Sequence, residues 1–556
     1  MQYRRYPVPL GSVSGWGWCF VGISELNGLL PQRLKLALKK RLTCETDNRR
    51  STSASMEWTS YLTYPTVVAA IAVVALTRIA WQVTQNVLFS PIPASVPGPL
   101  AARLTSKWIL LVDLSGSRAR TVNALHKRYG PVVRVAPNEL SFSSIDCVKP
   151  IYGAGTTCIK SSAYDNFGRL GSFQMQDPEQ HRQRQKRVAH IFAPASLQHM
   201  EPLIQSVIDR VLSAIGKRIG NPVDALHWCR MTALDVSGEV LLGKPFGAFD
   251  GDGEAPAYVH HLDNAYLVWS LYGLAPLLCG MLALLPIKSL REFMAAGDYV
   301  YKYGDDAMKE YLKLYGRKSS RRSLLTKIIA GDPATGTEPL SDPEISVEVS
   351  NLVFAATDTT GNTMTYALYR LCCHPEWQEK LRAEIRNSGA REAGFSFQSL
   401  QSLPVLNGVV METLRLHPAA PSALPRVTTG SGCDIGGLWV PGKTLVSMQA
   451  FTTQRDPTYF PEPEKFDPNR WISDGAINSG TQEVRDMMLV WGKGSRICLG
   501  QHMATMEIKI LLARMIEVFE VRLQGEQTHD DMEMTDHFTL IPKGKKCGLV
   551  FTKVQG

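Results

Sequence analysis

Long uncharged runs are the most distinctive feature of the hydrophobic and polar pattern along this chain. Twenty uncharged residues extend from Trp58 to Thr77, and they include an unbroken apolar run from Val67 to Leu76. About 20 helical residues cross the hydrocarbon core of a bilayer, and aromatic residues favour its two edges. We therefore predict a transmembrane anchor at residues 58–80. A cleaved signal peptide fits less well, because no small-residue cleavage site follows.

A second uncharged stretch covers the 23 residues from Ala265 to Ile287 and is more hydrophobic than the first. Its length alone would predict another membrane span. However, Pro276 lies at its middle with Gly273 and Gly280 on either side, and proline interrupts a helix. We therefore expect two shorter pieces joined by a bend.

The rest of the pattern predicts mainly long helices, with one strand-rich patch around residues 426–448. Four prolines within residues 90–99 indicate a stiff hinge after the anchor. One long helix should begin at Ser341–Glu344, where serine and proline suit a first turn, and end near Cys373. Another should cover Val405 to Leu416. The predicted fold class is mainly α with a smaller β-rich region.

Composition is that of an ordinary globular protein: 556 residues, 44% hydrophobic and 20% charged, with a formal net charge of +9. Residues 1–55 carry +6 of that charge. The remainder therefore offers no basic face for nucleic acid, and we expect no nucleic-acid partner. We interpret residues 1–57 as a dispensable basic extension or a mistaken translation start. Alternatively, the basic stretch from Arg33 to Arg41 lies on a membrane.

Eleven cysteines are scattered along the chain without the paired spacing of a disulfide framework or a zinc site. We therefore expect reduced thiols that face the cytosol. Cys372, Cys373 and His374 are consecutive, but adjacent cysteines cannot easily meet one ion in good geometry. We interpret them as packing at a helix end.

The strongest chemical signal is the loop from Trp491 to Gly500, which contains Cys498. Gly492 and Gly494 permit a tight turn whose amides can point at sulfur, and a helical pattern follows the loop. The amides and the positive end of that helix would both stabilise a thiolate. A buried structural cysteine is the alternative, but the surrounding pattern favours a functional thiolate.

Two further pairs of residues carry a weaker signal. Asp358 and Thr359 lie inside an apolar helix, where a carboxylate is costly unless it has partners, which favours a functional role. Glu412 and Arg415 are three residues apart, so they share one helix face and can pair. An ordinary surface pair is the alternative for the second.

The cysteine loop resembles the haem-binding loop of the cytochromes P450, Phe-x-x-Gly-x-Arg-x-Cys-x-Gly, with Trp491 in place of phenylalanine. By that resemblance, the cofactor is haem b and Cys498 is the axial thiolate ligand of its iron. The resemblance further implies that Arg496 contacts a haem propionate and that Trp491 covers the thiolate side.

Other motifs resemble the same family in the same order along the chain. Asp358 and Thr359 match its oxygen-activation segment, in which Thr359 would hydrogen-bond the oxygen being activated and Asp358 would help to relay protons. Glu412, Arg415 and Arg470 match its structural Glu-Arg-Arg network.

Arg426 and His181 match propionate-binding positions of the family, although a surface arginine is the alternative for Arg426. Gln185 stands where the family has a second arginine, so that contact is either weakened or taken by Arg184. The excess positive charge around residues 177–187 suits an acidic redox partner or, equally, a solvated helix face.

The resemblance implies a cytochrome P450 fold over residues 100–556 and a monooxygenase that inserts one oxygen atom of O₂ into an apolar small molecule. Hydroxylation, epoxidation and multistep oxidation are all open. Electrons from NADPH would arrive through a separate reductase, with cytochrome b5 as an optional second donor. The chain most resembles fungal members that make secondary metabolites such as polyketides, terpenoids or alkaloids.

The implied location is the endoplasmic reticulum membrane, with a single span and the catalytic domain facing the cytosol. Residues 265–287 would then form a membrane-dipping lid beside the substrate entrance, because the motif residues on both sides of this stretch share one pocket. The alternatives are a haem-thiolate isomerase, dehydratase or peroxygenase, and a non-catalytic haem sensor or electron carrier.

Overall fold

The structure is a computed structural model that describes residues 64–249, 255–321, 323–331 and 338–554. The basic extension and the start of the expected anchor lie outside the described residues. The chain divides into two units, residues 1–78 and residues 79–556. The second unit contains every motif named above.

Helix α2 (Tyr64–Leu88) occupies the place of the expected anchor and continues past residue 80. Its segment Val68–Leu88 has a mean hydropathy of 1.4 and is the one helix of the described residues that is long and apolar enough to cross a membrane. Apolar side chains such as Leu76 and Trp81 are exposed.

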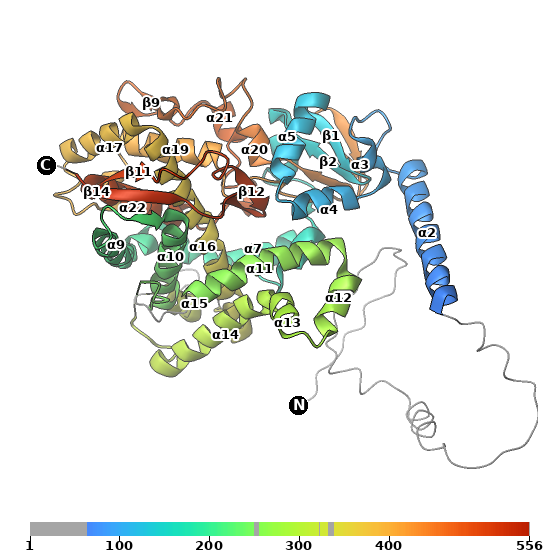
Figure 1. The fold of residues 1–556 in the computed structure, drawn as a ribbon, viewed down its shortest axis with the longest axis horizontal. Helices are drawn as coiled ribbons and strands as arrows, with labels where there is room; N and C mark the ends of the chain where they lie inside the picture. Colours follow the sequence, from blue (N-terminus) through green and yellow to red (C-terminus); the bar gives the residue numbers. More distant parts are fainter. Residues whose placement is uncertain (1–63, 250–254, 322, 332–337, 555–556) are drawn as a thin grey trace, which may run out of the picture. The chain divides into compact units, whose positions relative to one another are not determined.

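The second unit is mainly helical (Figure 1). Its helices are α3 (Leu100–Leu104), α4 (Lys107–Leu114), α5 (Arg118–Tyr129), α6 (Val148–Tyr152), α7 (Pro178–Val188), α8 (Pro194–Gln198), α9 (Glu201–Gly216), α10 (Ala225–Ser237), α11 (Ala255–Leu274), α12 (Pro276–Leu284), α13 (Lys288–Met294), α14 (Ala296–Tyr315), α15 (Leu324–Ala330), α16 (Asp342–Cys373), α17 (Pro375–Asn387), α18 (Phe397–Leu400), α19 (Pro404–Leu416), α20 (Ala450–Thr453), α21 (Gln482–Met487) and α22 (Gln501–Val518).

Helix α16 is the central helix of this unit and packs against α10 and α14. Ser341 and Glu344 form a reciprocal capping box at its start, and proline occupies the first turn. The helix ends at Cys373, as the pattern predicts. The two cysteines of its last turn pack against the core, and His374 stacks on Phe466 with ring centroids 5.2 Å apart. The interpretation of these residues as helix-end packing is confirmed.

The strands form a five-stranded sheet and smaller ladders. The large sheet has the order β1-β2-β8-β5-β3, and a three-stranded sheet has the order β11-β14-β4. The strands are β1 (Val132–Ala136), β2 (Glu139–Phe142), β3 (Cys158–Lys160), β4 (Pro222–Asp224), β5 (Arg426–Thr428), β6 (Gly432–Ile435), β7 (Leu438–Pro441), β8 (Leu445–Ser447), β9 (Ile472–Ser473), β10 (Ala476–Ile477), β11 (Phe519–Leu523), β12 (Met534–His537), β13 (Thr539–Pro542) and β14 (Gly548–Lys553).

The expected strand-rich patch around 426–448 is confirmed, since four strands lie within it. The strands outside it, near residues 132–160 and 519–553, were not predicted. They are three to six residues long, and several pair with distant segments, as β2 does with β8 in parallel. Such short strands carry little local pattern, because their partners rather than their own sequence stabilise them.

The bend expected in the second apolar stretch is confirmed. Helix α11 ends at Leu274, Ala275 leaves helical geometry with φ −147° and ψ 67°, and Pro276 occupies the first turn of α12. The two pieces differ in burial: Ala265 and Trp269 of α11 lie in the core, whereas Leu277 of α12 is 84% exposed. The second piece contributes Cys279 to a small buried cluster with Val268 and Met294, and most of its other apolar side chains are exposed or partly exposed.

Candidate active site

The Cys498 loop has the tight geometry that its glycines predict. Gly492 and Gly494 both adopt positive φ, 67° and 62°, which other residues rarely adopt. A Cβ at Gly494 would lie 2.1 Å from the carbonyl oxygen of Tyr152, so only glycine fits there. The Cys498 amide donates a hydrogen bond to the Trp491 carbonyl at 2.8 Å, which closes the loop.

Cys498 has exposed surface as a residue, but many protein atoms surround its thiol group. This burial raises the pKa of the thiol, while the amides of Gly500 and Gln501 act in the opposite direction. Helix α22 begins at Gln501 and directs its positive end toward the loop. The loop amides and the start of the helix therefore favour a negatively charged sulfur. A cation bound beside the sulfur would complete the stabilisation of the thiolate.

Four basic groups from distant segments form a cluster near this loop. His181 on α7, Arg426 on β5 and Arg496 in the loop were predicted, and Lys160 on β3 was not. Lys160 and Arg426 are direct cross-strand partners. The amino group of Lys160 also donates to the Phe173 carbonyl.

Mutual repulsion and burial perturb the pKa values of these groups. Burial, together with Arg496, Lys160 and Arg426, lowers the pKa of His181 to about 4. Burial and the neighbouring arginines hold the pKa of Lys160 well below its usual range. Burial, with Arg426, lowers the pKa of Arg496 to about 10.

None of these four groups forms an ion pair with a carboxylate in the part of the chain that the structure describes. Like charges on opposite strand positions are unfavourable unless an anion lies between them. A ligand with two carboxylates beside the thiol loop, such as haem with its two propionates, meets that requirement. The donor set of this site therefore fits haem.

Arg184 does not join the basic cluster. Its guanidinium donates to Glu344 at 2.6 Å and to Glu348 at 3.0 Å, both on α16. These carboxylates already neutralise it, so Arg184 connects α7 with α16 and does not replace the propionate contact missing at Gln185. Lys160 is the additional cation, and no local pattern marked it, because a three-residue strand brings it to the site.

Asp358 and Thr359 occupy different environments on α16. Ala355 is exposed and Thr359 is partly exposed, although most of the helix around them is buried. The Thr359 hydroxyl donates to the Ala355 carbonyl at 2.7 Å. Asp358 is buried and pairs with Arg230 of α10 at 2.7 Å. Burial raises the pKa of Asp358, and the Arg230 charge opposes the shift.

Arg230 extends this network toward the surface. Its guanidinium also pairs with Asp263 of α11 at 2.5 Å, and the Asp263 side chain is 45% exposed. No sequence signal predicts this arginine, since nothing in the local pattern of α10 sets it apart. Its position links the acid next to Thr359 with a solvent-accessible carboxylate.

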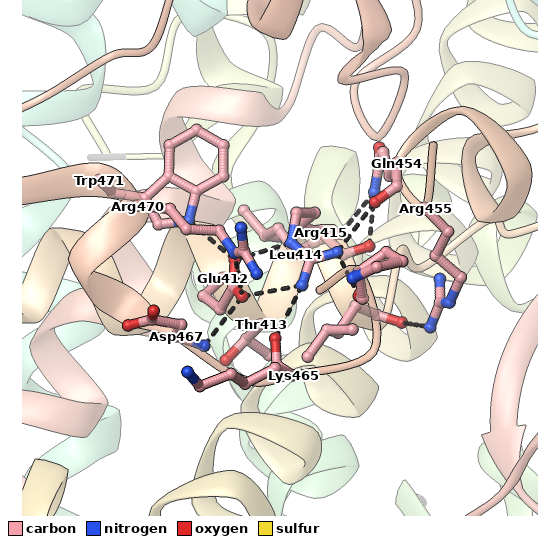
Figure 2. Close-up of polar contacts among 12 residues, drawn as sticks. Glu412, Thr413, Leu414, Arg415, Gln454, Arg455, Lys465, Asp467, Arg470 and Trp471 are labelled. Atoms are coloured by element: carbon pink, nitrogen blue, oxygen red, sulfur yellow. Dashed lines mark hydrogen bonds and ion pairs between the residues drawn. The ribbon is translucent and has the colours of Figure 1, made fainter. Parts of the chain in front are cut away.

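The expected Glu-Arg-Arg network is present, as Figure 2 shows. Glu412 and Arg415 are completely buried and pair at 2.8 Å, and Arg470 contacts the same carboxylate at 3.2 Å. The Trp471 indole donates to Glu412 at 3.0 Å. Arg415 also donates to three backbone carbonyls, those of Gln454, Pro463 and Lys465.

A cavity of about 360 Å³ opens between α4, α11, the Ser162–Phe167 turn and the β12–β13 hairpin. Aromatic residues form much of its wall, including Tyr164, Phe167, Trp269 and Phe538. Cavities of this size and character bind small organic molecules. Tyr164 also connects it to the basic cluster, because Lys160 lies 3.8 Å from the centre of the Tyr164 ring.

Comparison with known proteins gives a consistent result. The cytochrome P450 family model matches residues 97–549. Cytochrome P450 monooxygenase ORF9 of Penicillium roqueforti is 30% identical over 82% of this chain and 88% of its own length. Cytochrome P450 monooxygenase orf2 of Aspergillus niger is 28% identical over 86% of this chain and 96% of its own length.

Solved structures show the same fold. The retinoic acid-bound cyanobacterial CYP120A1 superposes with a TM-score of 0.67 at 21% identity, over 83% of this chain and 99% of that one. The haem domain of cytochrome P450DA gives a TM-score of 0.69 at 17% identity, over 83% and 98%. Together with the family match, these likenesses show that this chain belongs to the cytochrome P450 family, as a monooxygenase that uses haem with a cysteine thiolate ligand, O₂, an organic substrate and a redox partner.

Proposed function

We propose that Cys498 is the thiolate ligand and that the basic cluster of Lys160, His181, Arg426 and Arg496 holds the haem propionates. The observation that carries this proposal is the convergence, beside the glycine-shaped cysteine loop, of four basic groups that form no ion pair among the described residues. When bound, haem with a thiolate ligand supplies the electron density that favours O–O cleavage. The protein holds the cofactor and controls water and protons around it.

The polar groups of α16 fit a role in proton delivery. The Thr359 hydroxyl is accessible, and donating to Ala355 leaves its oxygen free to accept a hydrogen bond. Asp358 is its neighbour in sequence and reaches solvent through Arg230 and Asp263. We infer that Thr359 positions a proton donor at the reacting oxygen and that the Asp358 network resupplies it.

Replacement of Thr359 by alanine should therefore leave haem and substrate binding intact but release several-fold more peroxide per NADPH consumed. Thr357→Ala is the matched control, because its hydroxyl makes the same contact one turn back, to Val353 at 2.8 Å, but is fully buried. The measurement is the ratio of product to NADPH. An unchanged ratio in Thr359→Ala would count against the proposed role of Thr359.

For the biological setting, we infer oxidation of an apolar small molecule in fungal secondary metabolism, with electrons from an NADPH-cytochrome reductase and optionally from cytochrome b5. Relatives in Aspergillus and Penicillium support this setting. The exposed Lys186 of α7 provides positive charge for an acidic redox partner.

We infer attachment to the endoplasmic reticulum membrane with the catalytic unit in the cytosol, and two surfaces support the contact with a membrane. One is α2, with its apolar segment Val68–Leu88. The other is the α12 patch, which we define as Leu277, Met281 and Leu284, exposed by 84%, 60% and 72%. Apolar side chains presented together on one helix suit shallow immersion in lipid.

A chain without residues 1–81 should therefore stay peripherally bound to membranes and be released by mild detergent. Adding Leu277→Asn and Leu284→Asn should move most of it to the soluble fraction. Trp439→Asn, at an exposed apolar position on β7, is the control and should leave the distribution unchanged. Fractionation measures the effect, and equal retention of all three forms would argue against the patch.

A further inference from the structure

Charged side chains are concentrated at one part of the wall of the 360 Å³ cavity. Asp113 of α4, Glu139 of β2 and Asp536 of β12 all line it, together with Arg118 of α5. The cavity wall therefore holds three carboxylates and one guanidinium. The histidine in the same wall, His537, does not supply the missing positive charge, because burial and Lys545 lower its pKa.

The guanidinium is fully engaged by two of these carboxylates. One terminal nitrogen of Arg118 donates to Asp113 at 2.9 Å, and the other donates to Glu139. An anionic ligand would have to displace one of them. Arg118 thus holds the acidic groups in place and leaves the cluster with an excess of negative charge.

Asp536 is the carboxylate without an ion-pair partner among the described residues. It is 95% buried, accepts a hydrogen bond from the Ser422 hydroxyl and accepts another from the Phe538 amide at 3.2 Å. Burial raises the pKa of Asp536, and burial likewise raises that of Asp113 to about 6. A cation in the cavity would relieve both penalties.

A second, independent observation comes from the aromatic wall. Phe167 lies 5.3 Å from Trp269 and 4.5 Å from Phe538 between ring centroids, which forms a broad apolar surface. The buried Tyr266 hydroxyl lies near Asp358 and Thr539 but makes no hydrogen bond of normal geometry within the described residues. Aromatic faces next to carboxylates are the surroundings that organic cations prefer.

We propose that the cavity selects a substrate with a positively charged amine on an apolar, ring-containing body. The amine would lie among Asp113, Glu139 and Asp536, and the rings would pack against Trp269 and Phe538. This inference rests on the proposed monooxygenase function, and it narrows the substrate from apolar molecules in general to alkaloid-like amines. A neutral ligand would leave the excess negative charge uncompensated.

Three probes with the same phenylbutyl body test the proposal: a trimethylammonium ion, a neutral acetamide and a carboxylate. The quaternary ammonium cannot coordinate iron, so binding reports the cavity alone. Equilibrium dialysis against the full-length, detergent-solubilised holoenzyme at pH 8 should show the cation binding about tenfold more tightly than the amide. The carboxylate should bind most weakly. Equal binding of cation and amide, or tighter binding of the carboxylate, overturns the proposal.

Variants of the carboxylates locate the effect. Asp113→Asn and Asp536→Asn should each reduce the preference for the cation to a few-fold. Asp113 is the more accessible of the two, so its variant still tests the proposal if Asp536→Asn fails to fold. Glu533→Gln is the matched control, because Glu533 lies next to β12 but pairs with Arg120 outside the cavity wall. A preference that survives both cavity variants contradicts the assignment.

The carbon monoxide spectrum of the same samples separates this inference from the proposed function. A thiolate-type spectrum without a preference for the cation would remove the substrate assignment and leave the monooxygenase. A preference for the cation without a thiolate-type spectrum would remove the monooxygenase on which the substrate assignment rests.

Discussion

Replacement of Cys498 by serine is expected to remove thiolate-ligated haem and to abolish NADPH-dependent oxygen insertion. The reason is chemical: a serine hydroxyl is not deprotonated by the loop amides and does not supply the electron density of a thiolate. Haem content after purification and product formed per enzyme measure the effect. The loop backbone should persist, because Gly492, Gly494 and the hydrogen bond from residue 498 to Trp491 do not depend on sulfur.

Cys433→Ser provides the comparison for this variant. Cys433 is also partly accessible, but it lies on β6, 3.8 Å from the sulfur of Cys158 and outside the cysteine loop. This variant should retain haem and turnover. Full activity in Cys498→Ser together with loss of activity in Cys433→Ser would mean that the ligand lies elsewhere.

Replacement of Glu412 by glutamine is expected to destabilise the fold by about 3–5 kcal/mol, because it leaves the charge of Arg415 buried without a counter-charge. The Arg415 side chain is completely buried and has no route to water. The Arg470 pair and the Trp471 hydrogen bond depend on the same carboxylate, so the loss spreads to the 467–471 segment. Denaturant unfolding followed by tryptophan fluorescence measures the change.

Glu462→Gln is the control for this second prediction. Glu462 pairs with Lys465 at 3.3 Å, but its side chain is 73% exposed, so the pair contributes little. We expect a change within about 0.5 kcal/mol. A similar, small effect of both substitutions would show that the Glu412 network is not a structural element of the fold.

Local sequence predicts the parts of this protein that are determined by local chemistry. The capping box at Ser341 and Glu344, the glycines before Cys498 and the proline at 276 each fix the backbone within a few residues. Their positions could therefore be stated in advance. The same holds for Glu412 and Arg415, which are neighbours on one helical face.

Residues brought together over long distances were harder to predict. Lys160 reaches the basic cluster because β3 pairs with β5, and Arg230 reaches Asp358 because α10 packs against α16. Arg184 was expected near the haem, but the carboxylates of α16 bind it instead. In each case the deciding partner is far away in sequence, where periodicity and spacing carry no information.

The reduced carbon monoxide difference spectrum of the intact chain tests the central claim most directly, because its main band reports the atom that ligates the haem iron. The account predicts the strongly red-shifted band of a thiolate-ligated haem, and its loss in Cys498→Ser. A band typical of histidine-ligated haem, or a thiolate-type band that persists without Cys498, would contradict it.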